Sequence, residues 1–142
     1  MKETPDKKVL QVINQIHELA RVEGFLETLS EQWGFSARIS MILNLVLEEA
    51  LTNTILYGYD DSLEHTITLN FELEGDILSI SIFDDGHEYD PTQKEDPDIT
   101  LAAEDRQIGG LGIFLIKKNM DSVEYLRIEN KNCLILKKNI KS

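Results

Sequence analysis

Hydrophobic residues recur along the chain with periods that predict a strand and two helices before the chain's midpoint. A short β-rich run at 7–13 comes first, and apolar positions then recur at helical spacing over 17–33. Gly34 follows this run and suits a helix end. Ser36 is placed to cap a second helix that runs to about Tyr57.

The hydrophobic period changes to two after the second helix. Polar and apolar residues alternate strictly over 66–73 and again over 77–82, and Gly75-Asp76 between them is typical of a hairpin turn. Residues 84–108 then form a long acidic connection, with at most a helical turn near 100–104. Connections longer than about 12–15 residues are usually functional or disordered, so this one is a candidate for function.

The last part of the chain predicts one helix and two further strands. Gly109-Gly110-Leu111-Gly112 opens a helix through about Met120, and strands at 123–128 and 133–138 are joined around Asn130-Lys131-Asn132. Because the paired strands are adjacent in sequence, we expect an α+β fold with one mostly antiparallel sheet and helices on one face. Its length predicts a single domain over 1–142.

The charge and the cysteine count exclude several classes of partner and site. The chain has 26 acidic against 14 basic residues and a net charge of −12, which repels phosphate backbones and anionic lipid, so we expect no nucleic acid and no membrane partner. Cys133 is the only cysteine, which excludes an internal disulfide and a cysteine-based zinc site. With no apolar leader and no run of 18 apolar residues, we expect a cytoplasmic protein.

Two polar residues interrupt an apolar stripe of the second predicted helix. Glu49 and Asn53 lie one turn apart, among Ile42, Leu45, Val46 and Leu56 in helical projection. A carboxylate and an amide left unpaired there would cost several kcal/mol, so they need partners, water or a ligand. The ordinary interpretation is that Glu49 caps a loop or pairs with a lysine.

Two glycine-containing segments are further candidates for ligand contacts. Asp84-Asp85-Gly86 ends a strand, where an acid can accept a hydrogen bond from a ligand amine and glycine allows close approach, although Asp-Gly is also a common turn pair. Gly109-Gly110-Leu111-Gly112 leads into a helix N-terminus, which favours a phosphate, or else serves tight helix–sheet packing. The second segment is neither a Walker A loop nor GxGxxG.

The order and spacing of these segments is more specific than each one alone. Glu49-x-x-x-Asn53, then Asp84-x-Gly86, then Gly110-x-Gly112 resembles the three-box pattern of the GHKL ATPases, which share the Bergerat fold. Within them the chain most resembles the small anti-sigma-factor serine kinases of the RsbW and SpoIIAB type. The resemblance implies a two-layer sandwich of a mixed, mostly antiparallel sheet with helices on one face. It is carried by LEEALTNTILYGY (47–59), FDDGHEYDP (83–91) and IGGLGIFLIKKNMDSVEY (108–125).

The resemblance also implies a role for the residues of the first two boxes. Asn53 would coordinate the Mg²⁺ that bridges the ATP phosphates, and Glu49 would act as the general base toward the attacking hydroxyl. Asp84 would accept a hydrogen bond from the adenine amino group, and Gly86 would let the ring lie against the backbone.

The third box and the connection before it are implied to bind the phosphates. Gly110, Leu111 and Gly112 would cradle them, residues 87–108 would form an ATP lid, and Arg106 would neutralise the terminal phosphate. Many relatives carry a threonine near the last strand that supports an adenine-bound water. Its expected equivalent here is Cys133, whose thiol forms poorer hydrogen bonds than a hydroxyl.

The function that the resemblance implies is an ATP-dependent protein serine kinase in a partner switch. Its substrate would be a serine on a small STAS-domain antagonist, its other partner a sigma factor or similar effector, and its assembly a homodimer. The alternative is a module that uses ATP to hold a sequestering conformation with little or no phosphate transfer. Glu49 favours the enzyme, and a structural domain without nucleotide would leave Glu49 and Asn53 unexplained.

Overall fold

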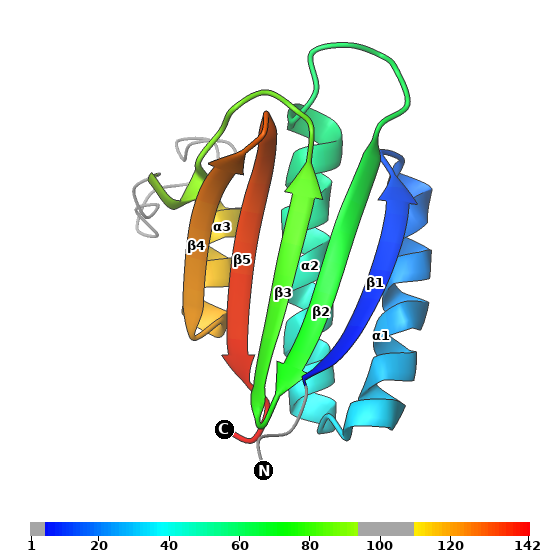
Figure 1. Ribbon diagram of the computed structural model, residues 1–142, viewed down its shortest axis with the longest axis vertical. Helices are drawn as coiled ribbons and strands as arrows, with labels where there is room; N and C mark the ends of the chain where they lie inside the picture. The colour runs from blue at the N-terminus through cyan, green and yellow to red at the C-terminus, as the bar shows by residue number, and fades with distance from the viewer. Residues whose placement is uncertain (1–4, 94–109) are drawn as a thin grey trace.

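The helices and strands form in the predicted order over residues 5–93 and 110–142, which are those described by the structure, a computed structural model (Figure 1). The predicted helical turn near 100–104 lies outside these residues. The strands are β1 (Asp6–Ile13), β2 (Thr66–Glu74), β3 (Ile77–Asp84), β4 (Ser122–Ile128) and β5 (Lys131–Asn139). The helices are α1 (Leu19–Trp33), α2 (Ala37–Tyr57) and α3 (Gly110–Asn119), with 3₁₀ turns η1 (Ile16–Glu18) and η2 (Pro91–Gln93).

The strands form one sheet in the order β1-β2-β3-β5-β4. Every pairing within the described residues is antiparallel, so the expectation of a mixed sheet is wrong for this part of the chain. The physical reason is that the path between two paired strands, whether a hairpin or a longer path through other elements, brings the chain back to the end of the sheet at which the first strand finished, so the second strand runs the opposite way. All three helices cover one face, which confirms the predicted two-layer arrangement (Figure 1).

The ends of the first two helices follow the predicted signals. Gly34 adopts the left-handed conformation with φ of 71°, which ends α1 at Trp33. The Ser36 side chain accepts a hydrogen bond of 3.1 Å from the backbone N–H of Ile39 and so caps α2. The first helix begins later than predicted, because residues 16–18 form a 3₁₀ turn before it.

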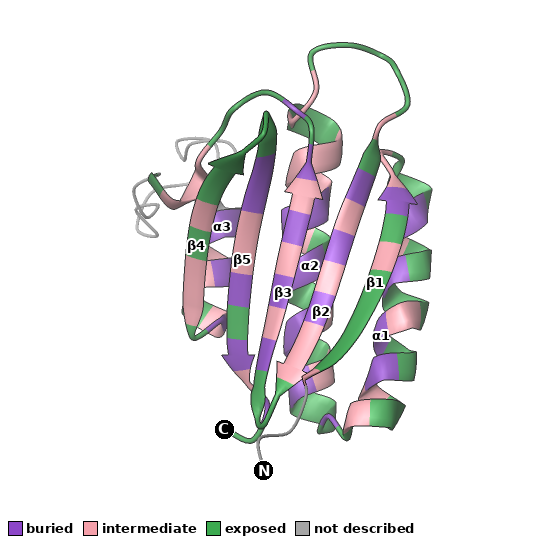
Figure 2. Ribbon diagram, viewed as in Figure 1, coloured by how far each residue is buried: buried purple, intermediate pink, exposed green. Residues whose placement is uncertain are grey.

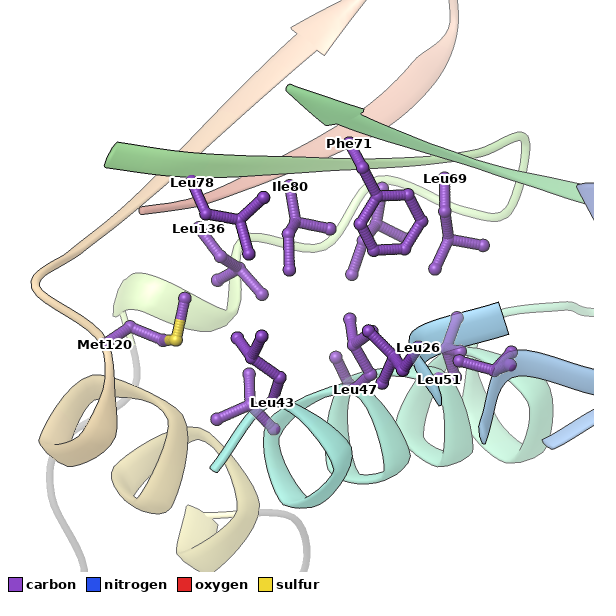
Figure 3. Packing of buried hydrophobic residues seen from close by; sticks show 14 of the residues in the cluster. Leu26, Leu43, Leu47, Leu51, Leu69, Phe71, Leu78, Ile80, Met120 and Leu136 are labelled. Carbon is purple, nitrogen blue, oxygen red and sulfur yellow. The ribbon is translucent and has the colours of Figure 1, made fainter. Parts of the chain in front are cut away.

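The core lies between the sheet and α2. Leu43, Leu47 and Leu51 recur every four residues on α2 and are 0% exposed, and the inward residues of β2, β3 and β5 pack over them (Figure 3). Burying one such side chain contributes about 1.5–3 kcal/mol, so this stripe fixes the helix against the sheet. By length and composition α2 could span a membrane, yet it is the central helix of this core. Buried and less buried positions alternate along β2 and β3, as the period of two predicts (Figure 2).

The turn between β4 and β5 is shorter than the sequence predicts. Glu129 and Asn130 have φ of 49° and 65°, and positive φ at both central positions is typical of a two-residue hairpin turn. Strand β5 therefore begins at Lys131, and Asn132 lies in the strand rather than in the connection.

Candidate functional site

A cavity of about 270 Å³ opens at the end of the sheet where β3 ends. The end of α2, the start of α3 and the β4–β5 hairpin meet at the same end of the molecule, opposite the end at which β1 begins (Figure 1). The walls of the cavity come from all of these elements, so the cavity is formed by segments that are far apart in sequence. The lining residues are Ala50, Asn53, Thr54, Tyr57, Gly58, Asp84, His87, Tyr89, Pro91, Ile113, Ile116, Tyr125, Asn132 and Leu134.

The structure brings the first and third predicted boxes together. Glu49 and Asn53 are half-buried on α2, and Gly112 is buried in the first turn of α3. A Cβ added at Gly112 would lie 3.1 Å from Oε2 of Glu49 and 3.8 Å from Nδ2 of Asn53. Glycine therefore lets the backbone at the start of α3 approach both polar side chains, where a larger residue would fill the space between them.

The surroundings of Glu49 bear on the ordinary interpretation, in which Glu49 caps a loop or pairs with a lysine. Of the residues that the projection places beside it, Ile42 and Val46 are buried in the core while Leu45 and Leu56 are exposed, so Glu49 lies at the border between core and solvent. Across residues 5–93 and 110–142, no lysine or arginine forms an ion pair with Glu49. The described structure therefore gives no support to a structural salt bridge. The neighbouring Glu48 is exposed, as the helical projection predicts.

The carboxylate of Asp84 is held at the other part of the cavity. Asp84 is 8% exposed, and its Oδ1 accepts hydrogen bonds of 2.9 Å from the backbone N–H of Gly86 and of 2.9 Å from Nδ2 of Asn132. Burial raises the pKa of this carboxyl, while the two hydrogen bonds oppose that rise. Asp84 thus makes the Asp-x-Gly turn and also lines the cavity, and its contact with a ligand amine stays a prediction.

Gly86 sits where two backbone segments touch. A Cβ added there would lie 2.2 Å from the carbonyl oxygen of Gly58, which accepts a hydrogen bond of 3.0 Å from the N–H of His87. A real Cβ cannot occupy that position, so only glycine allows the segment after β3 to pack on the end of α2. This contact fixes one wall of the cavity.

We expect Gly86→Ala to destabilise the fold by about 1–3 kcal/mol and to distort the cavity, because the methyl group meets backbone that cannot rotate away. Gly24→Ala is the matched control, since a Cβ at Gly24 on α1 has nothing within 4 Å. That control should be neutral or stabilising by up to about 1 kcal/mol, because alanine favours a helix. Urea unfolding of both variants measures the difference, and equal midpoints would contradict the close contact.

Asn132 is the site residue that the sequence analysis missed. It is buried on β5, directly opposite Asp84 in the β3–β5 register, and donates to Asp84 and to the carbonyl of His87 at 2.8 Å. Its Oδ1 accepts from the Tyr125 hydroxyl and from Arg127 at 3.0 Å. The sequence analysis assigned Asn132 to the predicted turn and therefore did not identify it as a site residue. Its place beside Asp84 follows only from the register between β3 and β5.

Cys133 does not take the place expected for it. It pairs with Phe83, and because successive strand residues point to opposite faces, its side chain lies on the face away from Asp84. The expectation that Cys133 supports a ligand beside Asp84 is therefore wrong, and Asn132 occupies that position. Burial raises the pKa of the Cys133 thiol, as suits an unreactive residue in the sheet.

Several predicted site residues lie wholly or partly outside the described structure. Arg106 and residues 94–108 of the predicted lid are not among the described residues, and nothing places them relative to the cavity. Gly110 is the first residue of α3, as the glycine-rich segment predicts, and Leu111 follows it in the first turn. His87, Tyr89 and Pro91, from the start of the predicted lid, line the cavity.

A polar cluster links the segment after α2 to the end of β3. The ring of His65 stacks on Tyr59 with centroids 4.3 Å apart, and its two nitrogens contact Asp61 at 2.7 Å and Asp85 at 3.0 Å. Only a protonated imidazole can donate to both carboxylates. The hydrogen bond to Asp61 raises the pKa of His65, and the charge of Asp85 adds to this effect.

We expect this cluster to make stability depend on pH. Because the folded pKa of His65 is raised above its ordinary 6.5, its contribution is fully present below that value and is lost as pH rises through the folded pKa. The stability difference between wild type and His65→Gln should therefore shrink from about pH 6 to about pH 9 in urea titrations. His17→Gln is the control outside the cluster, and a His65→Gln difference that grows with pH would contradict the assignment.

The geometry suits a ligand with a flat apolar part and a charged end. Apolar and aromatic side chains form most of the cavity wall, with a hydrogen-bond acceptor at Asp84. Asn53, which also lines the cavity, lies beside Glu49 and the first turn of α3, where free N–H groups and the helix dipole favour an anion. A nucleotide combines such a flat base with charged phosphates.

The comparisons with known proteins agree with a site for a nucleotide. Residues 14–138 match the family described as histidine kinase-like ATPase domain. The chain is 32% identical over 108 residues to the serine/threonine-protein kinase BtrW of Bordetella bronchiseptica, an alignment that covers 76% of this chain and 75% of that protein. It is 29% identical over 116 residues to the serine-protein kinase RsbW of Listeria monocytogenes, with 79% and 74% covered. It is 27% identical over 89 residues to an anti-sigma F factor of Oceanobacillus iheyensis, with 63% and 61% covered.

These matches confirm the resemblance that the three boxes predict. The family match covers most of the chain and includes Glu49, Asp84 and Gly112, and the fold is the predicted α+β sandwich. ATP use is implied by the family. The chain belongs to the histidine kinase-like ATPase domain family.

Proposed function

We propose that this chain is an ATP-dependent protein serine kinase and anti-sigma factor of a partner-switching system. The observation that carries the proposal is that Asn53 and the buried acceptor Asp84 line one cavity, while Glu49 and Gly112 lie together beside Asn53. We further propose that residues 1–142 act as one ATP-binding domain in the cytoplasm. The relatives named as serine-protein kinase and as anti-sigma F factor support the two parts of this function.

The adenine base binds at Asp84 in this proposal. The carboxylate accepts a hydrogen bond from the exocyclic amine. The missing Cβ of Gly86 makes room for the carbonyl oxygen of Gly58 rather than for the ring, so Gly86 serves the site by donating its N–H to Asp84. Guanine carries a carbonyl oxygen at the same position, which the carboxylate repels. The apolar wall around Ile113, Ile116 and Leu134 covers the faces of the base.

The phosphates lie toward the start of α3. The N–H groups of Gly110, Leu111 and Gly112 face them, and Arg106 neutralises the terminal phosphate. The amide oxygen of Asn53 is a hard ligand of the kind that Mg²⁺ prefers, and the absence of a Cβ at Gly112 leaves room beside it. A Mg²⁺ ion held by Asn53 would supply positive charge to offset the charge that develops on the phosphates during transfer.

Glu49 acts on the incoming serine. Its carboxylate accepts the proton of the serine hydroxyl while the hydroxyl oxygen bonds to the γ-phosphorus. The bond between that phosphorus and the oxygen bridging to the β-phosphate breaks, which leaves ADP and a phosphoserine. Because Glu49 is only half-buried, at the border between core and solvent, a serine on another protein can reach it.

The partners follow from the same proposal. The phosphorylated serine belongs to a small STAS-domain antagonist, and the sequestered effector is a sigma factor or a similar protein. The net charge of −12 suits a basic surface on such a partner. We also propose a homodimer as the working assembly.

Transfer of labelled γ-phosphate to a candidate STAS-domain protein tests the function. Wild type with Mg²⁺ and ATP should label that protein, and replacing its acceptor serine with alanine should abolish the label. A wild-type protein that binds ATP tightly but labels none of its interacting proteins would overturn the kinase proposal. The nucleotide-dependent sequestering module would then take its place.

A further inference from the structure

The side-chain amide of Asn132 is oriented by partners on both of its sides. Its Oδ1 accepts hydrogen bonds from the Tyr125 hydroxyl, from Nη1 of Arg127 and, at 3.4 Å, from the N–H of Tyr89. Its Nδ2 faces two acceptors, Oδ1 of Asp84 and the carbonyl oxygen of His87. Turning the amide over would place donors against donors and acceptors against acceptors, so its orientation is fixed.

This fixed orientation determines what Asp84 can do. The Asn132 amide and the Gly86 N–H both donate to the same oxygen, Oδ1 of Asp84. No described residue donates to its other oxygen, which leaves Oδ2 as the acceptor for a ligand. An NH₂ group cannot accept a hydrogen bond, whereas a hydroxyl at this position could either donate or accept.

We infer that Asn132 is a positioning residue that holds Asp84 as a charged acceptor and so makes the cavity select a base with a donor amine. The inference rests on the proposed function, because it concerns how the same cavity recognises ATP. It assigns the recognition of the base to the pair Asp84–Asn132 rather than to Asp84 alone. Arg127 supports the pair by donating to Asn132 and, at 3.1 Å, to the carbonyl oxygen of Gly86.

The charged groups around Asp84 explain why such support is needed. Burial raises the pKa of the Asp84 carboxyl and the charge of Asp85 adds to it, whereas Asn132 and Arg127 act in the opposite direction. Tyr59, from the segment after α2, has a pKa raised by burial and by these carboxylates, so it stays neutral. His87 also lines the cavity. Removing the Asn132 donor therefore favours a protonated Asp84, which no longer accepts well.

Asn132→Asp tests this role with little change of shape. The introduced carboxyl still accepts from Tyr125 and Arg127, but it places an oxygen where Nδ2 lies 2.9 Å from Asp84. Two carboxyls at that distance hold one proton between them until it is lost at higher pH. The ratio of the variant Kd for ATP to the wild-type Kd should be near one at about pH 6 and rise at least about tenfold by about pH 9.

Several comparisons separate this role from a structural one. Taking the ratio cancels the pH effects that ATP and the unchanged residues contribute to both proteins. Tyr125→Phe keeps the Asn132–Asp84 contact, so its ratio should stay constant with pH. A constant ratio for Asn132→Asp would overturn the inference alone, and a wild type that binds no ATP would overturn the proposed function with it. If Asn132→Asp does not fold, Asn132→Leu should move the acid loss of ATP affinity upward by about one pH unit, and an unmoved profile would overturn the inference.

Discussion

Glu49→Gln should reduce phosphorylation of the cognate antagonist by at least about two orders of magnitude while ATP affinity stays nearly unchanged. General-base catalysis typically contributes about 10²–10⁴-fold in rate, or roughly 3–5 kcal/mol of barrier. Glutamine keeps the size and the hydrogen-bonding reach of the side chain but cannot take the proton. The structure sharpens this expectation because Oε2 of Glu49 faces the start of α3, where the phosphates are proposed to lie.

Single-turnover transfer of labelled phosphate, with calorimetry for ATP affinity, separates the chemical step from binding. Glu48→Gln is the matched control, since Glu48 is its exposed neighbour on the same helix and should leave the rate unchanged. Asn53→Ala should instead weaken ATP binding in the presence of Mg²⁺, so the two site variants fail at different steps. A Glu49→Gln variant that transfers phosphate at the wild-type rate would show that Glu49 is not the general base.

Asp84→Asn should weaken ATP binding by at least about 100-fold, or roughly 3 kcal/mol. Gly86 and Asn132 both donate to Oδ1 of Asp84, so an amide at this position must turn its oxygen toward them. Its NH₂ group then points at the amine of adenine, and two donors face each other. Inosine triphosphate carries a carbonyl oxygen at the same position, so the variant should bind it better than wild type does.

This loss should not come from unfolding. Because burial raises the folded pKa of Asp84, its charged form destabilises the native state at neutral pH, and a neutral amide removes that penalty. The melting temperature of ligand-free Asp84→Asn should therefore equal or exceed that of wild type. Asp76→Asn, an exposed substitution in the β2–β3 turn, is the control for nucleotide binding. An Asp84→Asn variant that keeps the wild-type affinities for both ATP and inosine triphosphate would contradict the contact between Asp84 and adenine.

The hydrophobic periods predict the described helices and strands because each element buries one face. The change from helical spacing to alternation after Gly58 marks the passage from α2 to β2, and glycine and serine mark the helix ends. The spacing of Glu49 and Asn53 predicts their shared face for the same reason. Helix geometry alone fixes which residues lie one turn apart.

The contacts between strands could not be predicted with the same accuracy. A shift of one residue in a strand sends each side chain to the opposite face, so locating the last turn at 130–132 instead of 129–130 exchanged Asn132 for Cys133. The close approach of Gly86 to Gly58 was equally hidden, because it joins two segments that come together only when the sheet packs on α2. Such contacts depend on tertiary structure, which local patterns do not encode.

The pairing of β3 with β5 has a consequence for how the chain tolerates insertions. Asp84 and Asn132 are 48 residues apart, so forming their contact closes a long loop in the unfolded chain. The entropy of that closure grows only with the logarithm of loop length, and doubling the loop costs about 0.6 kcal/mol. Residues could thus be added between the end of β3 and the start of α3 with little loss of stability. The length of that connection is therefore free to be selected for activity.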